Sequence, residues 1–253
     1  MPPQQHFQQN RSDEVTRILS EAIKYHQAGH LIEAEQLYRK VIEAAPDHYD
    51  ALHRLALLYI HNGRPEHATP LLQDALLLQP KNPGILNSLG VALQINGSSQ
   101  QAVICFQQAL ALNPTYVGAL KNLGKALCDQ GNTKAALECF LKLIQLVPSS
   151  PEPYINIGRC YYETGDFQQA ILYLEKALEK KPDCIDALSG LAAALWVTGR
   201  WAEARTKLER ALQLAPNDAK MIINFGELFY QEGKLDEALR YFAMTLSQSP
   251  IAG

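Results

Sequence analysis

Prolines recur every 34 residues along this sequence, and the series continues without interruption for seven periods. A glycine precedes each of these prolines by 17 residues, and an alanine follows each glycine by five. The prolines are Pro46, Pro80, Pro114, Pro148, Pro182, Pro216 and Pro250, the glycines are Gly29, Gly63, Gly97, Gly131, Gly165, Gly199 and Gly233, and the alanines are Ala34, Ala68, Ala102, Ala136, Ala170, Ala204 and Ala238. Composition alone does not produce three series that stay in phase. The chain is therefore predicted to be an array of structural repeats.

One period, residues 151–184, has the pattern of two helices. Ile157 and Tyr161 are four residues apart, as on one face of a helix, and a glycine interrupts the pattern soon afterwards. Asp166 is placed to cap a second helix, and Pro182 ends that helix because proline cannot continue the backbone hydrogen bonding. Each period is therefore predicted to form a hairpin of two antiparallel helices.

A small residue and a bulky residue occupy fixed positions in every period. The eighth position holds Ala22, Ala56, Gly90, Gly124, Gly158, Ala192 or Gly226. The second helix supplies Tyr38, Leu72, Phe106, Phe140, Leu174, Leu208 or Phe242. Glycine inside a helix costs about 0.5–1 kcal/mol relative to alanine. Its use at four of these seven sites predicts that the two helices approach closely, with the bulky side chain filling the space around the small residue.

This pattern of L-G, tyrosine, G, A, F, A and P over 34 residues resembles that of the tetratricopeptide repeat family. The repeats are 15–48, 49–82, 83–116, 117–150, 151–184, 185–218 and 219–252. The resemblance implies an all-α solenoid of antiparallel helical hairpins that forms a right-handed superhelix. It also implies that the first helices line a concave groove that binds peptides or protein segments. Residues 1–14 are polar, and we expect them to form a disordered arm.

Composition and charge exclude several classes of function. The net charge of −3, from 23 basic and 26 acidic residues, offers no bulk attraction for nucleic acid or an anionic membrane. No segment approaches the roughly 20 apolar residues of a membrane-spanning helix, and residues 1–14 lack the pattern of a signal peptide. The five cysteines are odd in number and form no C-x-x-C pair, which favours free thiols. We therefore expect a cytoplasmic protein.

The centre of the array combines basic side chains with amides. By analogy with the family, Lys121 and Lys125 of the fourth repeat and Arg159 of the fifth face the groove. With Asn122 and Asn156 beside them, they form a candidate binding site for an extended acidic segment.

Asparagines at the sixth repeat position have two interpretations. Asn122, Asn156 and Asn224 share this position, where an amide can hydrogen-bond the backbone of a ligand. The alternative is that asparagine is simply common at this position in the family.

Aromatic residues recur at the twelfth position of the last three repeats. Tyr162, Trp196 and Tyr230 would form an apolar strip along the groove together with Val197 and Ile223. Aromatic side chains supply much of the binding energy at interfaces, which favours a binding surface. Ordinary packing between repeats is the competing explanation.

The sequence lacks the motifs of catalysis. His26, His53 and His61 would face the groove, but no cysteine or carboxylate spacing supports a metal site. No glycine-rich phosphate loop, nucleophile elbow or H-E-x-x-H motif is present. We therefore predict a protein without enzymatic activity, cofactor or metal.

Two hypotheses of function remain open. The first is a scaffold or adaptor that binds a peptide or an extended protein segment in its concave groove. The second is the substrate-recruiting N-terminal arm of a larger enzyme of the glycosyltransferase or methyltransferase type. Leu239 and Leu246 of the last helix have no later repeat to cover them, so the chain either pairs with another molecule there, such as a second copy, or continues beyond Gly253.

Overall fold

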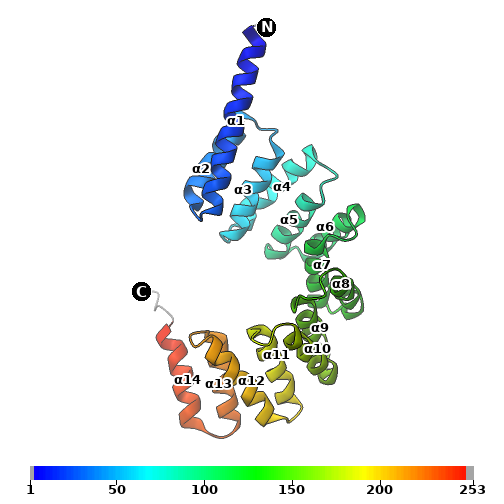
Figure 1. Cartoon of the computed structure of the whole chain (residues 1–253), viewed down its shortest axis with the longest axis vertical. Coiled ribbons are helices and arrows are strands. Elements are labelled where there is room, and N and C mark those ends of the chain that lie inside the picture. Colours follow the sequence, from blue (N-terminus) through cyan, green and yellow to red (C-terminus); the bar gives the residue numbers. More distant parts are fainter. Residues whose placement is uncertain (1–2, 249–253) are drawn as a thin grey trace. The chain divides into compact units, whose positions relative to one another are not determined.

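A computed structural model describes the backbone of residues 3–248 and the side chains of residues 12–219 and 222–244. The described backbone forms fourteen α-helices and no β-strand (Figure 1). The helices are α1 (Pro3–Gln27), α2 (Leu31–Ala44), α3 (Tyr49–His61), α4 (Pro65–Leu78), α5 (Pro83–Ile95), α6 (Ser99–Leu112), α7 (Val117–Asp129), α8 (Thr133–Leu146), α9 (Glu152–Glu163), α10 (Phe167–Lys180), α11 (Ile185–Val197), α12 (Trp201–Leu214), α13 (Ala219–Gln231) and α14 (Leu235–Gln248).

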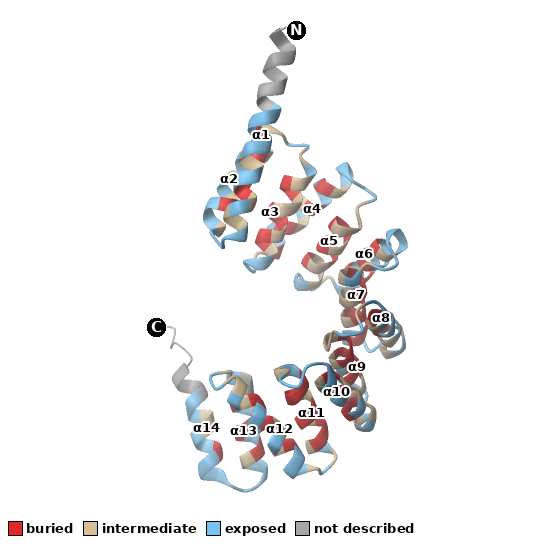
Figure 2. Ribbon diagram, in the orientation of Figure 1, coloured by how far each residue is buried: buried red, intermediate tan, exposed pale blue. Residues whose placement is uncertain are grey.

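The chain divides into two compact units within α7. Unit 1 ends at Ala126 and unit 2 begins at Leu127. In unit 1, α1 packs on α2, α3 on α4 and α5 on α6, while in unit 2 α9 packs on α10, α11 on α12 and α13 on α14. Figure 2 shows buried residues on the sides by which these consecutive helices meet. The architecture is therefore the all-α solenoid of sequential helix pairs that the sequence predicts.

The glycine series marks the turn inside each hairpin. All seven of these glycines have a positive φ, between 68° and 82°. At Gly165, for example, the φ of 82° lets Asp166 N–H donate to the carbonyl of Tyr161 at 2.9 Å, which closes the preceding helix. This left-handed conformation is costly for residues with a side chain, so glycine ends each first helix at the same point.

The first helix differs from the expectation for residues 1–14. We expected a disordered arm there, but α1 begins at Pro3 and runs without a break to Gln27. Proline is tolerated at the first position of a helix, because a backbone N–H at that position would have no hydrogen-bond partner within the helix. Glutamine is a good helix former, and no glycine interrupts the segment, so the backbone of residues 3–14 can continue the helix of the first repeat.

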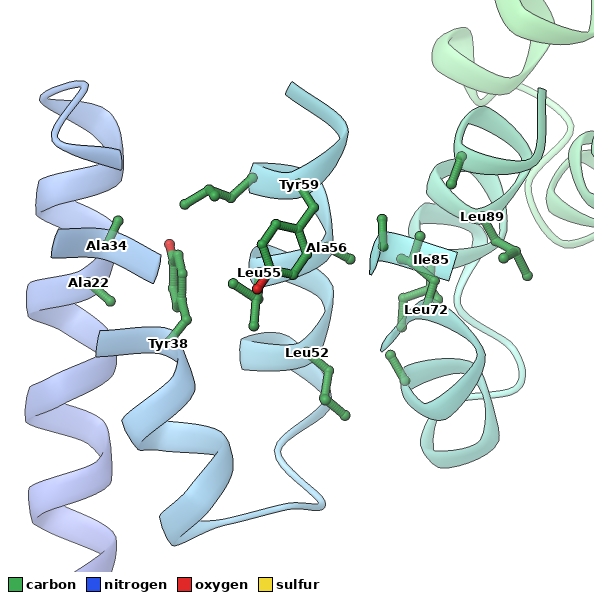
Figure 3. Close-up of a cluster of buried hydrophobic side chains, with 14 of the residues drawn as sticks. Ala22, Ala34, Tyr38, Leu52, Leu55, Ala56, Tyr59, Leu72, Ile85 and Leu89 are labelled. Carbon is green, nitrogen blue, oxygen red and sulfur yellow. The ribbon is translucent and has the colours of Figure 1, made fainter. Parts of the chain in front are cut away.

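The predicted close approach of the paired helices is confirmed. A Cβ atom added at Gly90 would lie 2.5 Å from the ring of Phe106, and one added at Gly158 would lie 2.6 Å from Leu174 Cγ. In the first hairpin, where alanine takes the place of glycine, Tyr38 of α2 is fully buried beside Ala22 of α1 (Figure 3). The small position and the bulky position therefore form the core of each of these hairpins.

The cysteines correct one expectation. A disulfide joins Cys128 of α7 to Cys160 of α9, with 6.0 Å between their Cα atoms. Cys105, Cys139 and Cys184 are free, so the prediction of five free thiols was wrong for this pair. The two bonded cysteines are separated by 32 residues, close to one repeat. Residues about one period apart lie side by side in a solenoid, and a search for C-x-x-C spacing misses such a pair.

The last helix exposes apolar side chains. Leu235 is 56% exposed and Leu239 is 65% exposed, in keeping with the lack of cover expected for Leu239. The side chain of Leu246 lies outside the described residues. Within the described chain, none of the helices has both the length and the apolar character needed to cross a membrane.

Candidate binding groove

A groove of about 520 Å³ lies on the first helices of the repeats in unit 2. Its lining comes from α9, α11 and α13, with one residue from α12. The lining residues are Tyr162, Ser189, Ala192, Ala193, Trp196, Val197, Leu208, Asn224, Glu227, Leu228, Tyr230 and Gln231. We refer to this surface as the unit 2 groove.

The three aromatic residues predicted at the twelfth repeat position all line the unit 2 groove. Tyr162 and Trp196 are partly buried and pack against the core, whereas Tyr230 is 58% exposed. The Tyr162 ring meets Phe167 edge-on at 5.4 Å between centroids, and Trp196 lies 6.0 Å from Trp201. The structure therefore brings the predicted aromatic strip together, and two of its members also contact an aromatic residue of their own repeat and pack against the core.

Small residues make the surface concave between these rings. Ala193 lies one turn before Val197 on α11, and Ala192 beside it is buried. Leu208 of α12 and Leu228 of α13 are also buried and close the base of the groove. Val197 is 50% exposed, so the groove offers both aromatic and aliphatic surface to solvent. Ile223, which the sequence also assigned to the strip, is 39% exposed but is not among the lining residues.

The asparagines at the sixth position take part in bonds between repeats. Asn122 Nδ2 donates to Asn87 Oδ1 at 3.0 Å, and Asn224 Nδ2 donates to Ser189 Oγ at 3.2 Å. In each pair the two residues are 35 positions apart, joining the fifth position of one repeat to the sixth of the next. We refer to these contacts as the 35-residue ladder. Each of these amides thus donates one hydrogen bond within the scaffold, and Asn224 also lines the unit 2 groove.

Asn156 is the exception among the three asparagines. It is 5% exposed, and its Nδ2 atom has no hydrogen-bond partner among the described residues. Buried amides are normally paired. Asn156 is not among the residues that line the unit 2 groove.

The basic residues predicted at the centre of the array belong to different units. Lys121 and Lys125 lie on α7 in unit 1, and Arg159 lies on α9 in unit 2. The Arg159 guanidinium lies 3.8 Å from Asp129 and 3.7 Å from Glu163. The positive charge of Arg159 is therefore already opposed by two carboxylates within unit 2.

The histidines of unit 1 lie in a different environment. His26 Nδ1 is 3.2 Å from the Tyr38 hydroxyl, and the His26 ring lies 6.3 Å from that of His61. Burial lowers the pKa of His26, with further lowering by His61 and Arg54. Burial also lowers the pKa of His53, whose Nε2 is 2.8 Å from Ser88 Oγ. Among the described residues, no cluster of three histidine, cysteine or acidic side chains is arranged to hold a metal ion.

Comparison with protein families identifies the class of this chain. Tetratricopeptide repeat models match residues 25–90 and 198–250, 83–116, 115–182 and 155–219, so that together they span residues 25–250. The chain belongs to the tetratricopeptide repeat family, whose domains mediate interactions between proteins. Comparison with curated proteins finds no significant match.

Solved structures agree with this class. A tetratricopeptide repeat protein from Parabacteroides merdae ATCC 43184 is 17% identical, with a TM-score of 0.81 over 95% of both chains. MamA is 30% identical over 64% of this chain and 94% of its own, with a TM-score of 0.59. YrrB, described as a tetratricopeptide repeat protein with an unusual peptide-binding site, is 23% identical over 68% of this chain and 88% of its own, with a TM-score of 0.58.

Proposed function

We propose that this protein is a scaffold that binds a peptide or an extended protein segment in the unit 2 groove. The observation that carries the proposal is the set of three aromatic side chains that line one concave surface together with exposed Val197. Aromatic residues are enriched at protein interfaces because a large apolar area is buried with little loss of side-chain freedom.

The geometry of the repeats favours an extended ligand. The first helices α9 and α11 pack directly against each other, and packed helices lie about 8–10 Å apart. An extended peptide advances about 3.3 Å per residue, so about three of its residues would span one repeat. A segment in the polyproline II conformation has three residues per turn, so every third side chain points the same way. Aromatic residues at the same position of three successive repeats can therefore contact every third residue of such a segment.

Polar groups in the groove can fix the direction of the bound backbone. Asn224 donates an amide N–H to Ser189, which orients the side chain, and its Oδ1 atom is an acceptor that a ligand backbone N–H can use. Gln231 lines the same groove and has both a donor and an acceptor. Hydrogen bonds of this kind contribute to orientation, while the aromatic contacts supply most of the affinity.

A random peptide library displayed on phage tests this proposal. Peptides selected on the wild-type protein would be measured again on Tyr230→Ala and on the control Tyr49→Ala, an exposed tyrosine of unit 1. The two residues are 58% and 39% exposed, so neither change should unfold the chain, and only Tyr230 lines the groove. Far-UV circular dichroism would verify that both variants remain helical.

We expect Tyr230→Ala to lower the affinity for the selected peptides by about tenfold or more, because truncating an interface anchor costs about 2 kcal/mol of binding free energy. Tyr49→Ala should bind them like the wild type. Peptides that bind Tyr230→Ala as well as the wild-type protein would show that the aromatic residues serve packing between repeats and that binding occurs elsewhere.

A further inference from the structure

The unit 2 groove has an unbalanced charge. Among the described residues that line it, Glu227 alone carries a formal charge, and the others are aromatic, aliphatic or neutral and polar. Glu227 is exposed and lies on α13, between Asn224 and Tyr230. A single carboxylate on an apolar surface attracts a positive charge more strongly than it would in open water, because the surrounding apolar groups reduce screening.

Two basic side chains of unit 2, those of Arg159 and Arg205, are already paired with carboxylates. Arg159 lies within 3.8 Å of Asp129 and Glu163. Arg205 lies 3.5 Å from Glu209 and 3.6 Å from Glu232. Among the described side chains, none forms a salt bridge with Glu227. A ligand can therefore supply the charge that complements it.

The aromatic residues of the groove suit a cation as well. A lysine or arginine is attracted to the face of an aromatic ring when it lies within about 6 Å of the ring centre. The protein uses this interaction itself, since the Arg205 guanidinium lies 5.0 Å from the centre of the Phe229 ring. Tyr162, Trp196 and Tyr230 offer similar surfaces in the same groove as Glu227.

We infer that the unit 2 groove recognises an extended segment in which a lysine or arginine is flanked by apolar residues. The aliphatic stem of the basic side chain packs on the aromatic rings, and its charged end meets the Glu227 carboxylate. The flanking apolar residues occupy the surface of Ala193 and Val197. This inference rests on the proposed function of the groove and adds the chemical class of the segment.

Three sets of acetylated pentapeptides test the inference. The four outer positions vary among leucine, valine, phenylalanine and tyrosine, and the central residue is lysine, its neutral analogue norleucine, or glutamate. Binding would be followed by the fluorescence of Trp196 in a Trp201→Phe background, where Trp196 is the only tryptophan. The proteins compared are this background alone, the same with Glu227→Gln or Glu227→Lys, and a control with Glu237→Gln, an exposed residue of α14 outside the groove.

We expect the lysine peptides to bind about tenfold more tightly than the norleucine peptides, as a cation placed between aromatic rings and a carboxylate would give. Glu227→Gln should reduce this preference to about threefold or less, Glu227→Lys should favour the glutamate peptides, and Glu237→Gln should change neither. Raising the salt concentration should lower the affinity for the lysine peptides more than the affinity for the norleucine peptides.

Two negative results would have different meanings. Equal binding of lysine and norleucine peptides, both weakened by Tyr230→Ala, would overturn the inference and leave the proposed function in place. If no pentapeptide binds and no displayed peptide depends on Tyr230, both the inference and the proposed function are wrong.

Discussion

Units 1 and 2 repeat the same 34-residue pattern but present different surfaces. In unit 2 the groove lies on the first helices of the repeats and is aromatic. In unit 1, two of the described cavities are lined mainly by the second helices, through residues such as Ile42, Leu71 and Leu77. A further cavity of unit 1 lies on the first helix α1, but its lining is largely polar and includes Asp13, Arg17 and Lys24. The first helices of unit 1 also carry His26, His53 and His61 at the positions that the family resemblance assigns to the groove. The comparison shows that the residues shared by all repeats build the scaffold, and that the positions left to vary decide which face can bind.

The largest expected difference between the units concerns the bulky core residue. Phe106 in unit 1 is fully buried, whereas its equivalent Phe242 in unit 2 is only partly buried. Phe106→Ala should lower the free energy of unfolding by about 3–5 kcal/mol, the usual cost of a deleted buried phenylalanine. Phe242→Ala should cost distinctly less, because water already reaches part of its ring.

Urea denaturation followed by far-UV circular dichroism measures both changes. Hydrogen exchange of peptides from α5 and α6 would locate the loss in Phe106→Ala. Equal losses for the two variants would contradict the difference in packing between these two hairpins.

A smaller difference is expected for the small residue that faces the core. A Cβ at Gly90 would lie 2.5 Å from the Phe106 ring, and one at Gly226 would lie 2.7 Å from the Phe242 ring. Gly90→Ala should destabilise by about 1–3 kcal/mol, because overpacking displaces a ring that is enclosed on all sides. Gly226→Ala should lower the free energy of unfolding by a smaller amount, since Phe242 is partly exposed and its ring can shift.

Gly190→Ala is the matched control for these two variants. Its added Cβ would lie 3.2 Å from the Cδ2 atom of Leu174, a longer contact than at Gly90 or Gly226, which a shift of a few tenths of an ångström relieves. The change should be neutral or slightly stabilising, since alanine favours the helix by about 0.5–1 kcal/mol over glycine. Thermal melting of the three variants would rank them, and a different order would show that a feature other than the neighbouring ring controls the cost.

The smallest expected difference is a dependence of stability on pH. All seven histidines lie within the first 67 residues. Burial lowers the pKa of His53 below the ordinary value of 6.5, so the unfolded chain binds this proton more readily than the folded chain. The stability associated with neutral His53 is therefore present above pH 6.5 and is lost as the pH falls through the lowered pKa.

His53→Gln should reduce the loss of stability between pH 7.5 and pH 5.5, as measured by the urea midpoint at each pH. His67→Gln, which alters an exposed histidine paired with Glu66, provides the comparison. An unchanged pH dependence in His53→Gln would mean that burial of this imidazole does not contribute to the acid sensitivity.

Much of the architecture could be predicted from the sequence because its signals are local. A glycine that must adopt positive φ and a proline that ends a helix act within a few residues, so the repeat period predicts where each hairpin turns. From α3 onwards, the first helix of each pair begins at or one residue after the predicted repeat start, as at Tyr49 and Glu152. The aromatic strip could also be predicted, since one repeat position corresponds to one face.

Features that depend on the offset between repeats could not be predicted in the same way. The bonds from Asn122 to Asn87 and from Cys128 to Cys160 join residues separated by 35 and 32 positions. These separations are close to the 34-residue period but not equal to it, because adjacent hairpins pack with an offset along their helices. The repeat pattern does not give this offset, so the structure was needed to show which residues pair.

The 35-residue ladder has a consequence for the order of the repeats. His53 pairs with Ser88, and Ser189 pairs with Asn224, but the corresponding residues Ile155 and Gly190 cannot form a side-chain hydrogen bond. Each junction thus has its own chemistry, although every repeat has the same backbone plan. A chimera that exchanged two whole repeats would keep the helical framework yet place polar groups opposite apolar ones. The repeats therefore share one backbone structure, but each has side chains suited to its own neighbours.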